Sequence, residues 1–301
     1  MQRIVPCIWF NRTAAEAVDF YSSVFPDSRR ISQLHYPAQD LPEFQAHLAG
    51  EVLTEEFELA GFRFVAVNAG SEFTPTPAVS FFVSFDPGRD ADASDRLEEV
   101  WARLCEHGRV LMPLQAYPFS PRYGWVEDRY GVSWQLRLST NPRDPARPIV
   151  PCLMFGHTIQ GQAHPAIEFY SQVLHGAPGT LIAHPDDGAL AGEVMYAEFQ
   201  LLGQWFSAMD APDQTMTFTP GVSLILKCPD QTHIDRYWDA LSAVPEAEQC
   251  GWCQDRFGLS WQIVPEQIDA ALAPPGAYRR LLAMKKIDIA ALASGGGPDS
   301  G

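Results

Sequence analysis

The sequence predicts an α+β protein in which one set of strands and helices occurs twice, and three observations support this fold class. The segment DRYGVSWQL at residues 128–136 returns as DRFGLSWQI at residues 255–263, with only apolar-for-apolar exchanges. Four other blocks recur in the same order, among them IVPCIWF from Ile4 and IVPCLMF from Ile149. Within each half, stretches with the two-residue period of strands are separated by stretches with the period of amphipathic helices.

The first half shows the expected order of elements. Alternation and helical spacing predict a strand at 4–10, a helix at 14–25, strands at 31–36, 52–60 and 62–68, then a strand at 78–85, a helix at 94–107, and strands at 110–117, 124–128 and 132–138. Thr13 and Glu16 have the spacing of a capping box at the start of the first helix. Each half is therefore expected to contain two units of a strand, a helix and three strands.

The repeat divides the chain into two expected domains, residues 1–140 and 149–265. Residues 141–148 are expected to be a linker, because the segment TNPRDPARP contains three prolines and cannot continue a strand or helix. Residues 266–301 are expected to form a helical extension, split by Pro274-Pro275, and a flexible tail. The extension either caps a domain or lies at an oligomer interface, and the sequence leaves both open.

Composition argues against several classes of partner. The formal charge of −16 would repel a phosphate backbone, so no nucleic acid is expected. No apolar run reaches the ~18 residues of a membrane span, and the start of the chain lacks the layout of a secretory signal. Six cysteines are too few for a disulfide scaffold. We expect a cytoplasmic protein without a membrane partner, and whether it forms a homo-oligomer stays open.

The order of the blocks resembles a known superfamily. Phe20 and Tyr21 close the first helix, and a GW pair precedes D-R-[FY]-G-[VL]-S-W-Q in both halves. This arrangement is similar to the vicinal oxygen chelate superfamily, which includes glyoxalase I and bleomycin-resistance proteins, and within it to the PhnB-like branch, often labelled demethylubiquinone methyltransferase. The resemblance implies tandem domains, each with two βαβββ units that form a cup-shaped mixed sheet around a ligand. Whether the units pair within a half or across halves is left open.

Strand alternation assigns the faces of the repeated segment. One set should pack under the helices: Val132, Trp134 and Leu136 in the first copy, and Leu259, Trp261 and Ile263 in the second. The other set should face the hollow: Ser133, Gln135 and Arg137, and then Ser260, Gln262 and Val264. Gly131 and Gly258 suit a tight turn with positive φ.

No metal and no cofactor are expected. In metal-using relatives four side chains hold one ion, and matching by motif places these positions at Pro6 and Pro151, Phe64 and Phe206, Ser80 and Ser223, and Gln135 and Gln262. Proline and phenylalanine offer no side-chain donor, and serine is a poor ligand on its own. Outside the final tail no G-x-G turn is present that would bind a nucleotide or S-adenosylmethionine.

Two hollows are therefore expected to bind small molecules. The first is predicted to be lined by Phe64, Ser80, Phe82, Gln135 and Arg137, under an aromatic rim that contains Tyr117 and Trp125. The second is predicted to be lined by Phe206, Ser223 and Gln262. The rim segment LMPLQAYPFSPRYGW shortens to LSAVPEAEQCGW in the second half, so the first hollow should be the better closed.

Three functions remain open at this stage. We favour a protein that binds or sequesters a small molecule whose identity the sequence does not give. The alternative is an enzyme of unassigned reaction, glyoxalase- or isomerase-like or matching the methyltransferase label, in which Gln135, Ser80 or an unmatched residue such as Glu55, Glu56 or His35 performs acid-base chemistry. Because Glu55 and Glu56 are adjacent, they would face opposite sides of a strand and could not act together. A third hypothesis is a structural fusion that mimics a dimer of single-domain relatives.

Overall fold

The computed structural model describes residues 2–139, 147–185, 187–188, 190–212 and 216–294. The predicted linker at 141–148 therefore lies mostly outside the described residues, as does the end of the tail. The first half contains β1 (Ile4–Phe10), α1 (Ala14–Val24), β2 (Arg29–His35), η1 (Glu43–Leu48), β3 (Val52–Leu59), β4 (Phe62–Asn68), β5 (Val79–Phe85), α2 (Ala93–Cys105), β6 (Arg109–Tyr117), β7 (Ser120–Glu127) and β8 (Ser133–Leu138).

The second half repeats this order. It contains β9 (Ile149–Phe155), η2 (His157–Ile159), α3 (Ala163–Val173), β10 (Ala177–Ala183), β11 (Val194–Leu201), β12 (Gln204–Asp210), β13 (Val222–Cys228), α4 (Gln231–Leu241), η3 (Pro245–Ala247), β14 (Trp252–Gln254) and β15 (Ser260–Pro265). The extension forms α5 (Ile268–Leu272), α6 (Ala277–Leu282) and α7 (Ile289–Ala293). The predicted α+β fold class, with four strand-helix-three-strand units, is confirmed.

The units pair across the two halves of the sequence. Sheet A has the strand order β14-β15-β13-β1-β4-β3-β2, and sheet B has the order β10-β11-β12-β9-β5-β8-β7-β6. The halves are joined by two antiparallel pairings, β1 with β13 and β5 with β9. Each sheet thus combines one unit from each half, which answers the question that the sequence left open.

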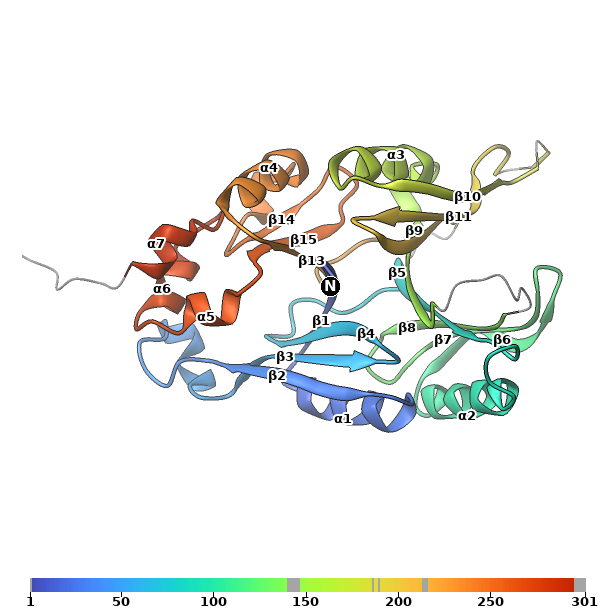
Figure 1. The fold of residues 1–301 in the computed structure, drawn as a ribbon, viewed down its shortest axis with the longest axis horizontal. Coiled ribbons are helices and arrows are strands. Elements are labelled where there is room, and N and C mark those ends of the chain that lie inside the picture. Colours follow the sequence, from blue (N-terminus) through green and yellow to red (C-terminus); the bar gives the residue numbers. More distant parts are fainter. Residues whose placement is uncertain (1, 140–146, 186, 189, 213–215, 295–301) are drawn as a thin grey trace, which may run out of the picture.

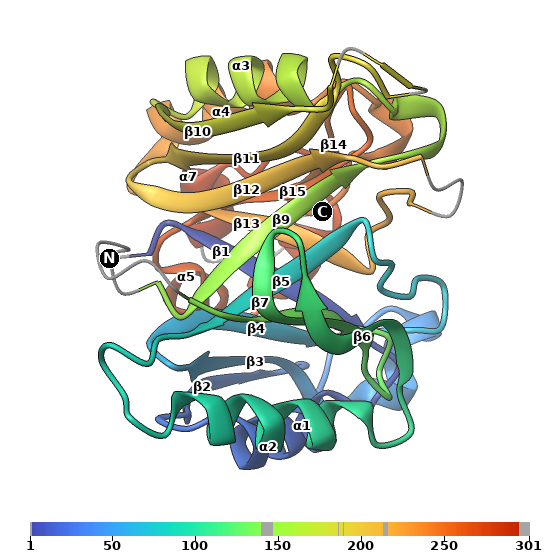
Figure 2. The same ribbon diagram turned by 90° about the vertical axis from the view of Figure 1, so that its right-hand side faces the viewer.

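Each sheet bends into a cup, and the two cups open on opposite sides of the molecule (Figure 1). Helices α1 and α2 of the first half cover one outer side of the molecule, and α3 and α4 of the second half cover the opposite side. Both sheets lie between these two helical layers (Figure 2). We call the concave face of sheet A hollow A and that of sheet B hollow B. In the described part of the chain, no helix has the length and apolar composition needed to span a membrane.

A buried aspartate explains why the same nine-residue segment occurs twice. Asp128 accepts hydrogen bonds from Tyr21 Oη (2.8 Å) and Trp134 Nε1 (2.8 Å), and from the amides of Tyr130 and Val132. It thereby ties the first helix of the half to the last strand, deep in the core.

The second copy reproduces this arrangement. Asp255 accepts from Tyr170 Oη (2.7 Å) and Trp261 Nε1 (2.8 Å), and from the amides of Phe257 and Leu259. Each half therefore needs its own Asp, its own Trp and the Tyr of the FY pair. Gly131 and Gly258 close the two turns at φ +83° and +88°, which confirms the predicted positive φ.

The predicted capping box at the start of α1 is wrong. The Thr13 side chain makes no cap hydrogen bond, and the first helical amide, Ala14 N, instead donates to Asn68 Oδ1 of β4 at 2.9 Å. In the second half Asp210 of β12 accepts from Ala163 N at 3.1 Å in the same way. A side chain from the neighbouring strand therefore satisfies the free amide, and it also fixes the helix to the sheet.

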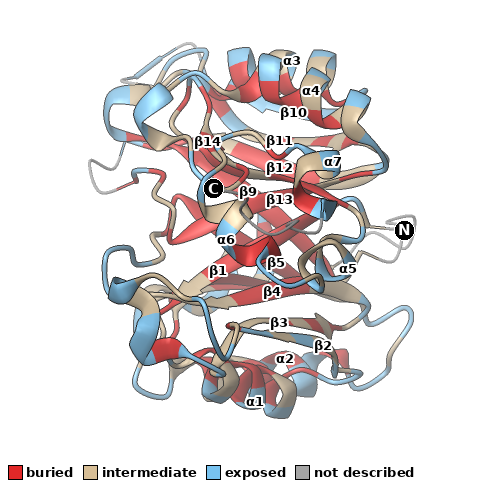
Figure 3. Ribbon diagram, turned by 90° about the vertical axis from the view of Figure 1, so that its left-hand side faces the viewer, coloured by how far each residue is buried: buried red, intermediate tan, exposed pale blue. Residues whose placement is uncertain are grey.

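The C-terminal extension lies on the open side of sheet A (Figure 3). Its backbone pairs with the turn before β14, where Cys250 N donates to Met284 O and Gly251 N donates to Lys285 O, both at 2.7 Å. Tyr278 of α6 packs against Tyr36, which follows β2, with ring centroids 5.9 Å apart. The extension therefore bridges the two edges of sheet A, and of the two roles left open by the sequence it caps a cup.

Candidate functional site

The floors of the two hollows are built from matching polar side chains. In hollow B, Gln135 Nε2 donates to Ser80 Oγ at 2.8 Å, and its Oε1 accepts from Tyr123 Oη at 2.6 Å. In hollow A, Gln262 Nε2 donates to Ser223 Oγ at 2.9 Å. Because paired strand residues face the same side of a sheet, Cys152 and Cys7 point to the same floors as Ser80 and Ser223.

The cysteines of the floors are neutral thiols. Burial raises the pKa of Cys7 to about 12 and that of Cys152 to about 11, although hydrogen bonds with the neighbouring Ser and Gln side chains oppose the shift. A thiolate is the reactive form of cysteine. Neither residue is therefore prepared for nucleophilic chemistry at neutral pH.

Above its floor, hollow B is lined by apolar and adaptable side chains. Its buried members and the partly buried residues that pack on them form one cluster: Phe82, Met112, Tyr117, Tyr123, Trp125, Val150, Cys152, Met154, Tyr196, Trp205, Met209, Ala211 and Met216. Part of this wall is the long hairpin of β6 and β7, which crosses the open side of sheet B (Figure 2). Unbranched methionines can repack around differently shaped groups.

Hollow A has a different character. Trp9 and Trp252 lie at one end with ring centroids 6.0 Å apart, and the ring of Phe73 lies 5.1 Å from that of Trp9. At the other end Glu56 binds Lys227 at 3.1 Å and Arg63 at 3.2 Å.

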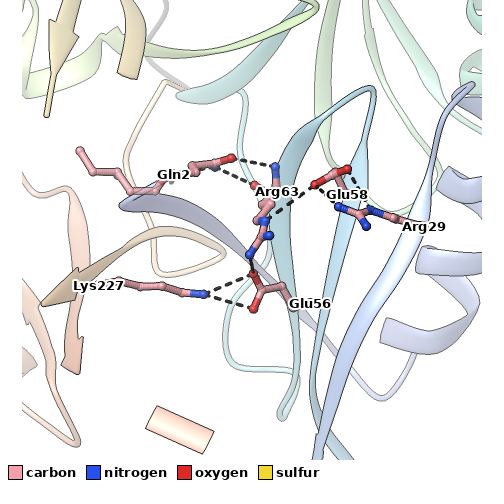
Figure 4. A network of polar contacts seen from close by, with 7 residues as sticks. Gln2, Arg29, Glu56, Glu58, Arg63 and Lys227 are labelled. Carbon is pink, nitrogen blue, oxygen red and sulfur yellow. Dashed lines mark hydrogen bonds and ion pairs between the residues drawn. The ribbon is translucent and has the colours of Figure 1, made fainter. Parts of the chain in front are cut away.

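The charged network continues toward the sheet edge, where Glu58 binds Arg63 at 3.7 Å and Arg29 at 3.0 Å (Figure 4). On the floors, the Gln262 side chain of hollow A is half-buried, whereas Gln135 of hollow B is only 1% exposed. That the first hollow is the better closed of the two stays a prediction, because each hollow combines units of both halves and the extension covers the open side of hollow A.

A charged group also stands at the end of hollow B. Glu198, at the repeat position of Glu56, accepts from Tyr196 Oη at 2.6 Å. Two guanidinium groups share this carboxylate, Arg137 at 3.6 Å and Arg147 at 3.4 Å. Arg137 also donates to Ser84 Oγ at 3.0 Å and lies 5.0 Å from the ring centroid of Phe82.

The structure distributes the predicted site residues over both hollows. It brings six of them together in hollow B: Ser80, Phe82, Tyr117, Trp125, Gln135 and Arg137. Ser223 and Gln262 lie in hollow A. Glu55 and Glu56 face opposite sides as expected, with Glu55 bound to Arg30 and Glu56 to Lys227.

Two predicted site residues, Phe64 and Phe206, were assigned to the wrong face. Both are fully buried on the helix side, where the ring of Phe64 packs 5.0 Å from Phe81 and that of Phe206 lies 6.1 Å from Phe199. The next residue along each strand, Val65 or Ser207, pairs with the floor cysteine and faces the hollow. The same one-residue correction moves the first motif position from Pro6 to Cys7 and from Pro151 to Cys152.

The four matched positions therefore hold Cys152, Ser207, Ser80 and Gln135 in hollow B, and Cys7, Val65, Ser223 and Gln262 in hollow A. Within the described ranges, no group of three or more His, Cys, Asp and Glu side chains is arranged to hold a metal ion.

Several residues of hollow B were missed by sequence reasoning, including Tyr196, Glu198, Trp205 and Met154. They belong to the second half of the chain, whereas the predicted wall of this hollow was drawn only from the first half. A pairing of units across the halves would have been needed to find them.

Comparison with known proteins identifies the family. A family model described as 3-demethylubiquinone-9 3-methyltransferase matches residues 2–137 and 147–264, more than half of the chain. The chain belongs to this family. The two matched segments correspond to the two halves of the repeat, so the family is present in tandem.

Solved structures extend the likeness. A protein from Bacillus cereus described as a putative 3-demethylubiquinone-9 3-methyltransferase, PhnB protein, is 34% identical over 46% of this chain and 100% of its own, with a TM-score of 0.39. Glyoxalase I from Zea mays is 10% identical, covers 89% of this chain and 92% of its own, and has a TM-score of 0.51. The vicinal oxygen chelate fold is thus confirmed for the tandem chain. A search of curated proteins found no match.

Proposed function

We propose that the protein binds a small, mainly apolar molecule in hollow B and acts as a binding or sequestering protein. The observation that carries the proposal is the buried cluster of methionine and aromatic side chains above a floor of fixed polar groups. Ligand sites typically combine an apolar concave wall with a few oriented polar groups. The floor amide of Gln135 is held at both ends, by Ser80 and Tyr123, and is thereby oriented in advance.

The same geometry argues for binding rather than for thiol chemistry. The only cysteine of the cluster in hollow B, Cys152, has a raised pKa and is a poor nucleophile. The methyl transfer in the family's description is not part of the proposal, because the sequence outside its tail has no glycine-rich turn for S-adenosylmethionine.

The two hollows provide a matched pair of variants for the test. Met154 in hollow B occupies the repeat position of Trp9 in hollow A, so Met154→Trp fills hollow B with a side chain that the fold accepts in the other cup. The neutral fluorescent probe N-phenyl-1-naphthylamine should bind the wild type saturably, and Met154→Trp should weaken its binding at least about tenfold. The converse exchange, Trp9→Met, should leave binding unchanged.

Thermal unfolding gives an independent readout, since a ligand at 100 times its dissociation constant adds about 2.7 kcal/mol of stability. Probe binding that is equally strong in Met154→Trp, or more sensitive to Trp9→Met, would show that hollow B is not the site.

A further inference from the structure

Three aromatic rings gather at one end of hollow A, from three different segments of the chain. Trp9 of β1 and Trp252 of β14 both face the hollow, because Trp9 is two residues from the floor cysteine Cys7 and Trp252 pairs with Gln262. Phe73 comes from the segment between β4 and β5. The Phe73 ring lies 5.1 Å from that of Trp9 at an angle of 85°, and the Trp252 ring lies 6.0 Å from Trp9 at 75°. Since both neighbours stand nearly perpendicular to Trp9, the three rings form walls and not a stack.

The rings are held in place and are still reachable. Trp9 Nε1 donates to Gly70 O at 2.8 Å, which fixes the plane of the indole. Trp9 and Trp252 are half-buried, and Phe73 is 40% exposed. Each of the three residues therefore keeps surface that a ligand can contact.

A carboxylate lies beside this aromatic end. The Glu72 carboxylate folds back over Gly70, where it takes the place that a Cβ would occupy. Gly70 is the residue whose carbonyl accepts from Trp9, so the carboxylate stands next to the peptide that holds the indole. In the part of the chain that the structure describes, Glu72 forms no ion pair. Its charge is therefore available to a cationic ligand.

The chemistry of this end favours a cation. The faces of aromatic rings are negative and attract positive groups. Five described arginines lie over rings elsewhere, but no described Lys or Arg lies over the three rings of hollow A. At the opposite end of the hollow, Lys227 and Arg63 both point toward Glu56 (Figure 4). The net charge of −16 adds a general attraction for cations.

The other hollow lacks this arrangement. The repeat positions of Trp9 and Phe73 hold Met154 and Met216 in hollow B, and only the third ring position stays aromatic, as Trp125. A thioether has no aromatic face for a cation. The two cups should therefore differ in the charge of the ligands they prefer.

We propose that the aromatic end of hollow A binds the quaternary ammonium group of a small organic cation. The methyl groups of the ligand lie against the rings of Trp9, Phe73 and Trp252, and Glu72 supplies the opposite charge. A quaternary ammonium has no N–H to donate, so aromatic faces can replace its water without hydrogen bonds. The proposal does not depend on ligand binding in hollow B, because it uses the side chains of the other cup.

Choline and its neutral isostere 3,3-dimethylbutan-1-ol are the probes, and binding is measured by calorimetry and ligand-detected NMR on the full chain. The wild type should bind choline at least about tenfold more tightly than the isostere. Trp9→Met and Phe73→Met, which introduce the residues of hollow B, should each weaken choline binding at least about threefold. Glu72→Gln should weaken the binding of choline and not that of the isostere. Phe119→Met, at a ring 68% exposed on the β6–β7 hairpin, is the matched control and should leave choline binding unchanged.

Absence of saturable choline binding, equal affinity for the two probes, or choline binding that neither Trp9→Met nor Phe73→Met weakens would overturn the proposal. If Trp9→Met does not fold, Phe73→Met, outside the strands, still decides the question. Competition separates the two hollows, because saturating choline should leave binding of the naphthylamine probe in hollow B unchanged.

Discussion

Replacing Asp128 with Asn should destabilise the protein although the two side chains have the same shape. The carboxylate accepts four hydrogen bonds, and Oδ2 alone receives those of Tyr21 and Trp134. In Asp128→Asn one carboxylate oxygen becomes an NH₂ group, and the indole N–H of Trp134 can only donate. One buried donor then stays unpaired and the remaining bonds lose their charge, which together should cost about 2–4 kcal/mol.

The pH dependence of stability gives a second signature. Burial raises the pKa of Asp128 to about 6, against the lowering effect of its four hydrogen bonds. The folded state therefore holds a proton more tightly than the unfolded state, whose carboxyl titrates near 3.9. Below about pH 4 this difference in proton affinity makes its full contribution to the free energy of unfolding. As the pH rises from about 4 to about 6, the contribution of Asp128 decreases by up to about 3 kcal/mol, and above about pH 6 it no longer changes.

Urea denaturation at several pH values measures both effects. The difference in free energy of unfolding between wild type and Asp128→Asn should grow as the pH falls from about 6 to about 4. Exposed Asp95 on α2 supplies the control, and Asp95→Asn should change stability by less than about 1 kcal/mol. Equal free energies of unfolding for wild type and Asp128→Asn at every pH would show that the Asp128 carboxylate does not stabilise the contact between α1 and β8.

Three further predictions concern local features of the fold. Gly131→Ala should lower the free energy of unfolding in urea by about 1–2 kcal/mol. The cause is the φ of +83°, not a steric clash, because the nearest atom to an added Cβ is 3.9 Å away. An unchanged free energy of unfolding would contradict the left-handed turn. Ile287→Ala, at a residue 1% exposed in the extension, should cost about 2–4 kcal/mol, whereas a loss below about 0.5 kcal/mol would mean that the extension does not pack as described. Cys152, with a pKa of about 11, should react with a thiol reagent at pH 8 only when the protein unfolds, and labelling of the native protein at the rate of a free thiol would refute its burial.

Much of the fold was predictable because the strongest signals are local. The alternation of DRYGVSWQL placed Trp134 and Leu136 in the core, and both are fully buried. The turn glycine was identified from its neighbours alone, and the strand and helix order followed from hydrophobic period. These features depend on residues within a few positions of one another, which a single sequence displays directly.

The faces of β4 and β12 were not predictable in the same way. In β4, Phe62, Phe64 and Ala66 alternate with Arg63, Val65 and Val67, so both faces are mainly apolar and only Arg63, near one end, marks the face toward the hollow with a charge. An assignment that is wrong by one residue places every side chain of the strand on the opposite face of the sheet, and this is the error made for Phe64. The equivalent Phe206 followed the same assignment.

Pairing of units across the halves was also beyond the sequence. The repeat makes the strands of the two halves similar in sequence, so β5 and β13 are both plausible neighbours of β1. The pairing with β13 depends on contacts between residues more than 200 positions apart in the chain, such as Ile4 with Leu226. The cluster around Tyr196, Glu198 and Trp205 could not be added to hollow B without that knowledge.

The crossed pairing has an evolutionary consequence. Two identical chains that exchange units around a two-fold axis must present the same pair of cups, because any substitution appears in both. Here the exchange occurs inside one polypeptide, so Trp9 could arise in one cup while its counterpart became Met154. Because the two halves are separate parts of one chain, a substitution in one cup need not appear in the other, which allows a charged network in hollow A and a cluster of methionine and aromatic side chains in hollow B.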